Sequence, residues 1–414
     1  MKNGIKKNML SRYFVIRVAL LGLLIRVILI PFSMHVDPRF TGDIATMSYV
    51  VPIWNSSEPI SNSFIYPPLT YDTLSFYLRS LPYSLTQYLW DKPINGLVAQ
   101  FRWIDSPFVF RNLFVLKAWY LLPDFAIAFL LWRMLRGNLS RAQIGLLAWV
   151  FNPLVLYNGY FHGQFDLVPV FFVVLSLFFI RKEKPVWAAF WMGIGACYKI
   201  FPFAFLLPLA LILDHTWRGR FKILLVGTLP YLIFLVPNIQ RYAGVETYIS
   251  NSFFPAGYDL GSGSQVYFLL IFYAFLIWFL YHRQAQTFDD FWRACFAILL
   301  VYYQFSYFDL HYWVWIVPFA ILYFVKYPKK AAPFFVVIGL FLIALLAPTP
   351  LARFLSPISP NFFLKLPTLM EVLNSYLPML FISNLVRSLL AGTCFYLAWI
   401  LVRGMTHQNA EQSI

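Results

Sequence analysis

The sequence predicts an all-α, polytopic membrane protein with about twelve transmembrane helices and a long first outer loop. Composition is the first reason, because 60% of the 414 residues are hydrophobic, 12% are charged and the mean hydropathy is +0.67. Soluble domains rarely reach such values. The second reason is that the apolar residues fall in runs of roughly spanning length, each bounded by charge, proline or glycine. We therefore expect a single membrane-embedded domain over residues 1–414.

The first apolar run follows the Lys-rich start MKNGIKKN. No small-residue cleavage site follows that run, so we interpret it as an uncleaved anchor rather than a signal peptide. Several later runs are short, and two of them are also compatible with re-entrant segments. The expected helices cover 13–32, 110–132, 144–160, 167–180, 186–198, 201–213, 223–236, 266–281, 291–305, 312–325, 332–347 and 377–402.

The distribution of charge predicts the orientation. Threading the chain from a cytoplasmic N-terminus leaves 19 Lys and Arg with 5 acids inside, and 11 Lys and Arg with 12 acids outside. Short cytoplasmic loops collect Lys and Arg, so both termini are expected in the cytoplasm, with the protein resident in the plasma membrane. The same bias accounts for most of the net charge of +15, which therefore does not point to nucleic acid as a partner.

Cysteine usage excludes two classes of site. Cys197, Cys295 and Cys394 all lie inside apolar runs and none belongs to a CxxC pair. Neither a disulfide framework nor a zinc site of the CxxC type is expected.

The first outer loop, residues 35–109, is too long for a simple connector. Its first half carries GDI around Asp43 and YPPLTY from Tyr66, and loops of this kind often bind or react with a substrate. Its second half, 74–100, mixes Leu, Tyr, Phe and Trp with sparse charge, which is typical of short helices lying in the membrane interface.

Four groups of ionisable residues are predicted on the outer face: Asp43, the run HGQFD from His162 to Asp166, Lys199, and DLH from Asp309 to His311. Charged groups at the ends of membrane helices are functional candidates. Together they suit neutralisation of a phosphate by Lys and His while a carboxylate takes a proton from a hydroxyl.

Each of these groups also has a plain structural interpretation. Asp166 also fits an N-terminal helix cap, and Lys199 a side chain that reaches the lipid headgroups. His311, beside Tyr312, also fits an aromatic belt. Asp124 is expected to pair inside the helix bundle rather than to react.

Four stretches carry a resemblance to a known family: GDI with YPPLTY, FNPLVLYNGYFHGQFD, GIGACYKIFPFAFLLPL and FDLHYWVWIVPF. In this order they resemble the C superfamily of glycosyltransferases, and most closely the polyprenyl-phosphate-mannose-dependent enzymes of glycosyltransferase family 87. The resemblance touches most of residues 40–320 and implies a glycosyltransferase module over about 13–240, followed by C-terminal helices over about 265–403.

The resemblance implies an inverting transferase that moves a hexose, most plausibly mannose, from a polyprenyl-phosphate donor to a lipid-linked or glycan acceptor outside the cytoplasm. Asp43 would be the general base, and Lys199 with His311 would bind the donor phosphate. We expect five further residues to bind substrate: His162, Gln164, Asp166, Tyr66 and Asp309. Because Ile44 rather than an acid follows Asp43, we expect neither a metal nor another cofactor.

Two other functions fit the same pattern. A transporter or flippase of a lipid-linked sugar could share the helices and buried charges, although no internal two-fold repeat is evident. A protein O-glycosyltransferase would differ only in its acceptor. Under all three interpretations the partners are a lipid-linked sugar and membrane lipids.

Overall fold

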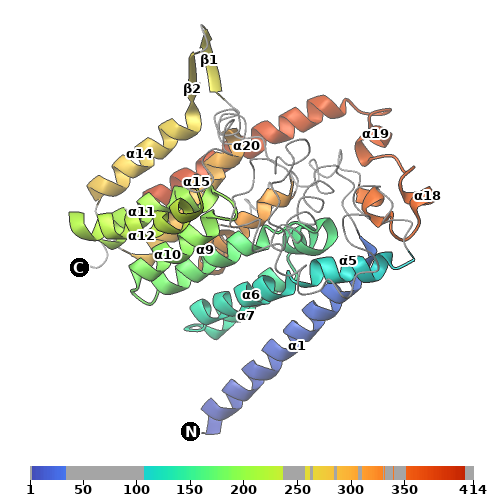
Figure 1. Cartoon of the computed structure of the whole chain (residues 1–414), viewed down its shortest axis with the longest axis horizontal. Coiled ribbons are helices and arrows are strands. Elements are labelled where there is room, and N and C mark those ends of the chain that lie inside the picture. The colour runs from blue at the N-terminus through green and yellow to red at the C-terminus, as the bar shows by residue number, and fades with distance from the viewer. Residues whose placement is uncertain are drawn as a thin grey trace, which may run out of the picture. The chain divides into compact units, whose positions relative to one another are not determined.

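The computed structural model describes residues 2–33, 107–235, 257–261, 264–283, 287–305, 310–329, 331, 339 and 351–405 (Figure 1). These residues are mostly helical, as the sequence predicts, and one two-stranded hairpin accompanies the helices. The chain divides into two compact units. Unit 1 comprises residues 1–171 and 346–377, and unit 2 comprises residues 172–345 and 378–414.

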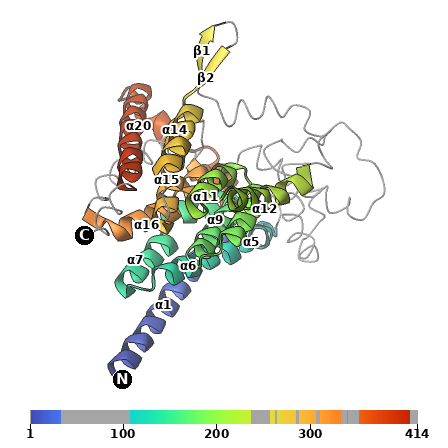
Figure 2. The ribbon, with the colours of Figure 1, turned by 90° about the vertical axis from the view of Figure 1, so that its left-hand side faces the viewer.

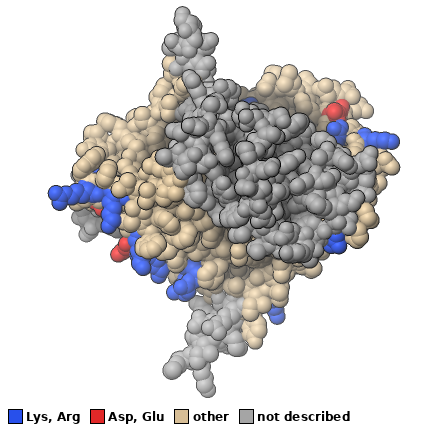
Figure 3. Space-filling model, viewed as in Figure 1, with Lys and Arg blue, Asp and Glu red and all other residues tan. Residues whose placement is uncertain are grey.

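Three helical stretches among the described residues are long and apolar enough to cross a membrane: Tyr13–Phe32, Leu139–His162 and Met379–Gly404. Other apolar helices are shorter, so the expected count of twelve spans stays a prediction. On the face drawn in Figure 3 most of the described surface is neither acidic nor basic, and Lys and Arg form small groups. The chain is an integral membrane protein.

Unit 1 is built on α1 (Lys2–Phe32), which packs against α5 (Val109–Ala118) and α7 (Leu139–Val150). The helix α6 (Leu121–Leu135) packs along α7. One continuous helix over 110–132 was expected, and the structure corrects this to two helices separated at Trp119 and Tyr120. Pro123 is the physical reason, because it has no N–H to donate to Trp119 and is tolerated only in the first turn of a new helix.

The predicted helix at 144–160 is likewise divided. Asn152 caps α8 (Pro153–Leu156) by accepting a hydrogen bond from the backbone N–H of Leu154 at 2.9 Å. Pro153 at the first position is favourable there but cannot continue α7. A π-helix, η3 (Tyr157–His162), follows directly, so the chain arrives at the HGQFD run in an unusual helical geometry.

Residues 351–377 of unit 1 form short helices: η7 (Leu351–Leu355), α18 (Pro360–Phe363) and α19 (Leu369–Leu373). Arg353 in η7 donates a hydrogen bond to the carbonyl of Leu366 at 3.4 Å and lies 4.0 Å from Glu371. Thr368 and Glu371 form a capping box at α19. Hydrogen bonding with the backbone and side chain of Thr368 lowers the pKa of Glu371, so this carboxylate is charged at neutral pH.

Unit 2 contains most of α9 (Leu167–Ile180) and then α10 (Pro185–Ala196), η4 (Phe201–Phe205), α11 (Leu206–Leu213) and α12 (Trp217–Leu235). The helices α10 and α12 pack closely because glycines meet at their contact. A Cβ atom on Gly193 would lie 2.1 Å from the carbonyl oxygen of Gly227. Small residues at such contacts let the helix backbones approach each other within a membrane.

The centre of unit 2 is α15 (Phe288–Phe305), in which every side chain from Asp290 to Val301 is buried. The helices α14 (Phe268–Arg283) and α20 (Met379–Gly404) pack beside it, as Figure 2 shows. The predicted helix at 312–325 divides into η6 (Leu310–Trp315) and α16 (Val317–Lys326), with Pro318 in the first turn of α16.

A hairpin of β1 (Gly257–Gly261) and β2 (Ser264–Tyr267) precedes α14, where an irregular loop was expected. Its antiparallel register pairs Tyr258 with Val266 and is interrupted between Asp259 and Gly261. The expected interfacial helices at 74–100 lie outside the described residues, as does most of the expected helix at 332–347.

Candidate functional site

The HGQFD run begins where the π-helix η3 ends. The backbone N–H groups of Gly163 and Gln164 both donate to the carbonyl of Asn158, at 3.0 and 2.8 Å. Gly163 has a φ of 81°, which a side chain would disfavour, so glycine suits this position. Such π-turns are frequent at functional sites. His162, Gln164 and Asp166 are all buried beside this turn.

Asp166 stands at the N-terminal boundary of α9, where its carbonyl accepts the helical N–H of Val170 at 3.2 Å. The Asn158 amide donates to Oδ2 of Asp166 at 3.3 Å, and the carboxylate is fully buried. From the sequence, an N-terminal helix cap and a catalytic role were about equally open for Asp166, which was also expected to bind substrate. Asp166 lies at the start of α9, and its catalytic and substrate-binding roles stay predictions.

His162 packs between a ring of its own helix and a ring from a distant part of the sequence. Its ring centroid lies 5.5 Å from that of Tyr157 and 5.9 Å from that of Phe354 in η7. Phe354 also contacts Phe161, with centroids 5.3 Å apart. The helix η7 therefore lies against the HGQFD region through Phe354. From the sequence, only the hydropathy of residues 351–355 could be interpreted.

A buried ionic network lies deeper in unit 1. Arg26 donates from Nε to Oδ2 of Asp124 at 2.5 Å. Asp124 also accepts hydrogen bonds from Trp149 Nε1 at 2.7 Å and from the Tyr160 hydroxyl at 2.6 Å. The expectation that Asp124 pairs inside the bundle is confirmed. Because four helical segments meet at this carboxylate, its role is to hold them together.

Lys117 is a buried lysine that the sequence did not single out. Its Nζ donates to the carbonyl of Ser33 at 2.6 Å, to the carbonyl of Tyr160 at 2.7 Å and to the Ser33 hydroxyl at 3.2 Å. The Tyr160 carbonyl can accept this hydrogen bond because its usual α-helical donor, the N–H of Gln164, donates to the carbonyl of Asn158 instead. Lys117 thus joins the end of α1 to the π-helix.

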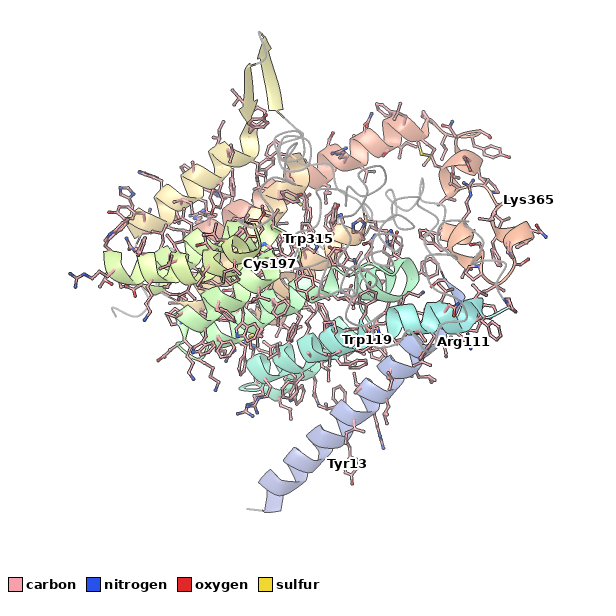
Figure 4. All side chains as sticks on the ribbon, viewed as in Figure 1. Tyr13, Arg111, Trp119, Cys197, Trp315 and Lys365 are labelled. Atoms are coloured by element: carbon pink, nitrogen blue, oxygen red, sulfur yellow. The ribbon has the colours of Figure 1, made fainter. Side chains whose placement is uncertain are left out.

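Lys199 in unit 2 has different surroundings. It follows α10 and is 8% exposed, and its Nζ lies 4.4 Å from the ring centroid of Tyr312 and 5.2 Å from that of Trp315. Trp315 stacks on Phe201 with centroids 4.2 Å apart. Figure 4 labels Trp315 and Cys197, which mark this aromatic group and the end of α10. Ring faces stabilise an ammonium charge.

His311 belongs to the same part of unit 2. The centroid of its ring lies 4.1 Å from the centroid of the Tyr312 ring, which Lys199 also contacts. The His311 side chain is 8% exposed. The structure therefore brings together Lys199 and His311, the two residues expected to bind phosphate, around one tyrosine. A lysine and an imidazole so placed can supply charge and hydrogen-bond donors to an anion.

Three of the expected site residues, Asp43, Tyr66 and Asp309, lie outside the described residues. Within the described ranges, no group of three or more His, Cys, Asp and Glu side chains is placed to hold a metal ion. Asp43 and its neighbours lie outside those ranges, so metal independence stays a prediction.

Comparison with known proteins gives the family. The sequence model of glycosyltransferase family 87 matches residues 64–305, which is more than half of the chain and includes the HGQFD run and Lys199. A curated relative from Trypanosoma brucei brucei, "GPI mannosyltransferase 1", is 24% identical over 263 residues, covering 57% of this chain and 53% of the relative.

A second relative with the same name, from Kluyveromyces lactis, is 21% identical over 131 residues, covering 30% of this chain and 32% of the relative. The chain thus spans about half or less of the curated relatives that it matches. No solved structure matches. The extent of the family match nevertheless settles the classification: this chain belongs to glycosyltransferase family 87.

Proposed function

We propose that this protein is an inverting membrane mannosyltransferase. It transfers a hexose from a polyprenyl-phosphate donor to a lipid-linked or glycan acceptor on the extracytoplasmic face. The match to glycosyltransferase family 87 over residues 64–305 carries the proposal. The choice of mannose is supported by the names of the two relatives, both mannosyltransferases. The proposal includes about twelve spans in a single domain and cytoplasmic termini.

Asp43 is the proposed general base. It takes the proton from the acceptor hydroxyl as that oxygen attacks the anomeric carbon and the bond from this carbon to the phosphate oxygen breaks. The leaving phosphate is a weak base, so no general acid is needed. The oxygen of the acceptor replaces the phosphate oxygen from the opposite side, which inverts the configuration, and the products are the glycoside and the polyprenyl phosphate.

Lys199 and His311 are the proposed donor-phosphate ligands. The position of Lys199 against Tyr312, next to His311, supports this role because a phosphate is best held by cations and N–H donors in a partly desolvated place. His162, Gln164 and Asp166 are proposed to bind substrate from the buried turn after η3, together with Tyr66 and Asp309.

A direct test is purified protein in vesicles with a panel of synthetic polyprenyl-phosphate hexoses and a mixture of glycolipid acceptors. The proposal predicts acceptor-dependent release of polyprenyl phosphate, fastest with mannose, and a glycosylated product of inverted configuration. Movement of an intact donor across the bilayer without cleavage would instead establish a flippase. Transfer to a protein acceptor alone would establish a protein O-glycosyltransferase.

A further inference from the structure

Residues 351–377, named here the outer segment, have two different sides. The inner side packs on the HGQFD region through Phe354, which is fully buried against Tyr157, Phe161 and His162. Arg353 ties η7 to the chain beyond α18 through the carbonyl of Leu366, so the segment is folded onto itself rather than extended.

The other side of the outer segment exposes large apolar residues. Phe362 is 58% exposed and Tyr376 is 81% exposed. The remaining members of this exposed set are Ile358, Leu364, Leu369, Val372 and Leu377. Polar residues such as Asn361, Lys365 and Asn374 are exposed between them, and Figure 4 shows Lys365 extending away from the ribbon. Single exposed apolar residues are ordinary, but a run of this length in one short segment indicates a binding surface.

The position of the segment in the chain identifies the partner. Residue 378 is the N-cap of α20, a helix long and apolar enough to cross a membrane. The outer segment therefore ends where a helix of spanning length begins, which suits a place at the bilayer surface. The exposed apolar residues continue into that span with Leu380 and Phe381. Short helices that mix exposed Phe, Leu and Tyr with Lys and Asn suit the boundary between headgroups and acyl chains.

We propose that the outer segment docks on the lipid surface of the membrane with Phe362, Leu369, Val372 and Tyr376 inserted at the headgroup boundary. Through Phe354 the same segment contacts the π-helix that carries His162. Docking therefore fixes the depth at which the HGQFD region sits relative to the lipid headgroups. This proposal does not depend on the identity of the sugar or on the transfer reaction.

The test places a polarity-sensitive fluorophore on single introduced cysteines in the full-length protein. Phe362→Cys and Val372→Cys report the proposed lipid-facing side. Phe381→Cys in α20 is the lipid control, and Ser140→Cys, exposed in the first turn of α7, is the water control. The native Cys197, Cys295 and Cys394 are buried, which limits background labelling. Vesicles contain phosphatidylcholine and phosphatidylglycerol, with part of the phosphatidylcholine spin-labelled on its acyl chain near the headgroup.

We expect labels at 362 and 372 to lose fluorescence to the spin-labelled lipid, as at 381, and to be less sensitive than the label at 140 to iodide in water. Strong iodide quenching at 362 and 372 with no lipid quenching would overturn the proposal, because those residues would face water. Protection from both quenchers would also overturn it, because a protein surface would then cover the segment.

Discussion

Two buried lysines, one in each unit, occupy opposite chemical settings. Lys117 in unit 1 is 1% exposed, and its Nζ donates to the oxygens of Ser33 and Tyr160. Lys199 in unit 2 is 8% exposed and lies over the rings of Tyr312 and Trp315. The first lysine bonds to the backbone at two helix ends, whereas the second is placed by ring faces beside a histidine.

The difference teaches how to separate charges that hold the fold from charges that act on a substrate. Lys117 and the Arg26–Asp124 pair satisfy backbone carbonyls and join helices, so their removal should appear first as lost stability. Lys199 and His311 are the proposed phosphate ligands, so removal of Lys199 should appear first as lost donor binding. Three of the four predictions below test this separation, and the other tests the packing of the helices.

The largest expected effect is on turnover, at the proposed base. Asp43→Asn keeps the size of the side chain but removes its ability to take a proton. Because a positioned general base contributes roughly a hundred- to ten thousand-fold, kcat should fall by about that factor while unfolding temperature and donor binding are kept. Steady-state transfer assays with a labelled donor would measure it.

Asp37→Asn is the control for this variant, because Asp37 precedes Pro38 in an expected turn and should keep most of the activity. Substantial transfer by Asp43→Asn, or an inactive Asp37→Asn, would reject Asp43 as the base. Asp166 would then be the next carboxylate to test.

The second effect is on stability, at the charged pair of unit 1. Asp124→Asn leaves the Arg26 guanidinium buried with no carboxylate partner, and breaking such a pair costs about 3–5 kcal/mol. We expect a large fall in unfolding temperature in detergent, measured by tryptophan fluorescence or calorimetry.

The matched control in unit 2 is Asp289→Asn. Asp289 pairs with Lys326, but the two side chains are 28% and 26% exposed, so water screens their attraction. Its loss of stability should be smaller than that of Asp124→Asn. Equal losses of stability in the two variants would show that burial does not determine how much each ion pair contributes to stability.

The third effect concerns helix packing. Gly193→Ala places a Cβ atom against the carbonyl of Gly227, so α10 and α12 must move apart at a cost of about 1–3 kcal/mol. Gly392→Ala in α20 is the control, because a Cβ atom there meets nothing within 4 Å, and alanine favours the helix. Thermal unfolding should rank Gly392→Ala at or above the wild type and Gly193→Ala well below it. The reverse order would contradict the close α10–α12 contact.

Apolar runs and their lengths were enough to locate most of the long helices of both units, but not their breaks or the short helices of residues 351–377. The predicted helix at 167–180 has the observed bounds of α9, because LVPVFFVVLSLFFI is apolar throughout and ends at charged residues. Pro123, Pro153 and Pro318 are the residues in the sequence that break these helices. Each proline lies within a longer apolar run, which was therefore predicted as one continuous helix. The hairpin was also signalled, since Gly-Ser-Gly separates two short β-prone runs.

The candidate site was predicted in part. Motif order singled out Lys199 and His311, but their shared contact with Tyr312 required the fold, because more than a hundred residues separate Lys199 from that ring. Lys117 was passed over because it is one cation in an apolar helix, and its role appears only when the carbonyls of Ser33 and Tyr160 are placed around it. Phe354 gave no sequence signal, because a phenylalanine in an apolar stretch is ordinary.

The most direct measurement compares Lys117→Met and Lys199→Met side by side in the same preparation, recording unfolding temperature and donor KM for each. Lys117→Met removes the donor to the buried Ser33 carbonyl, whereas the Tyr160 carbonyl keeps the Ser33 hydroxyl as a donor. One unsatisfied buried group costs about 1–3 kcal/mol, so the unfolding temperature of Lys117→Met should fall. Lys199→Met should keep the wild-type unfolding temperature and raise donor KM about 10–100-fold, as expected for loss of one charge-assisted contact to phosphate. A Lys199→Met protein that unfolds as early as Lys117→Met but binds donor normally would contradict the account.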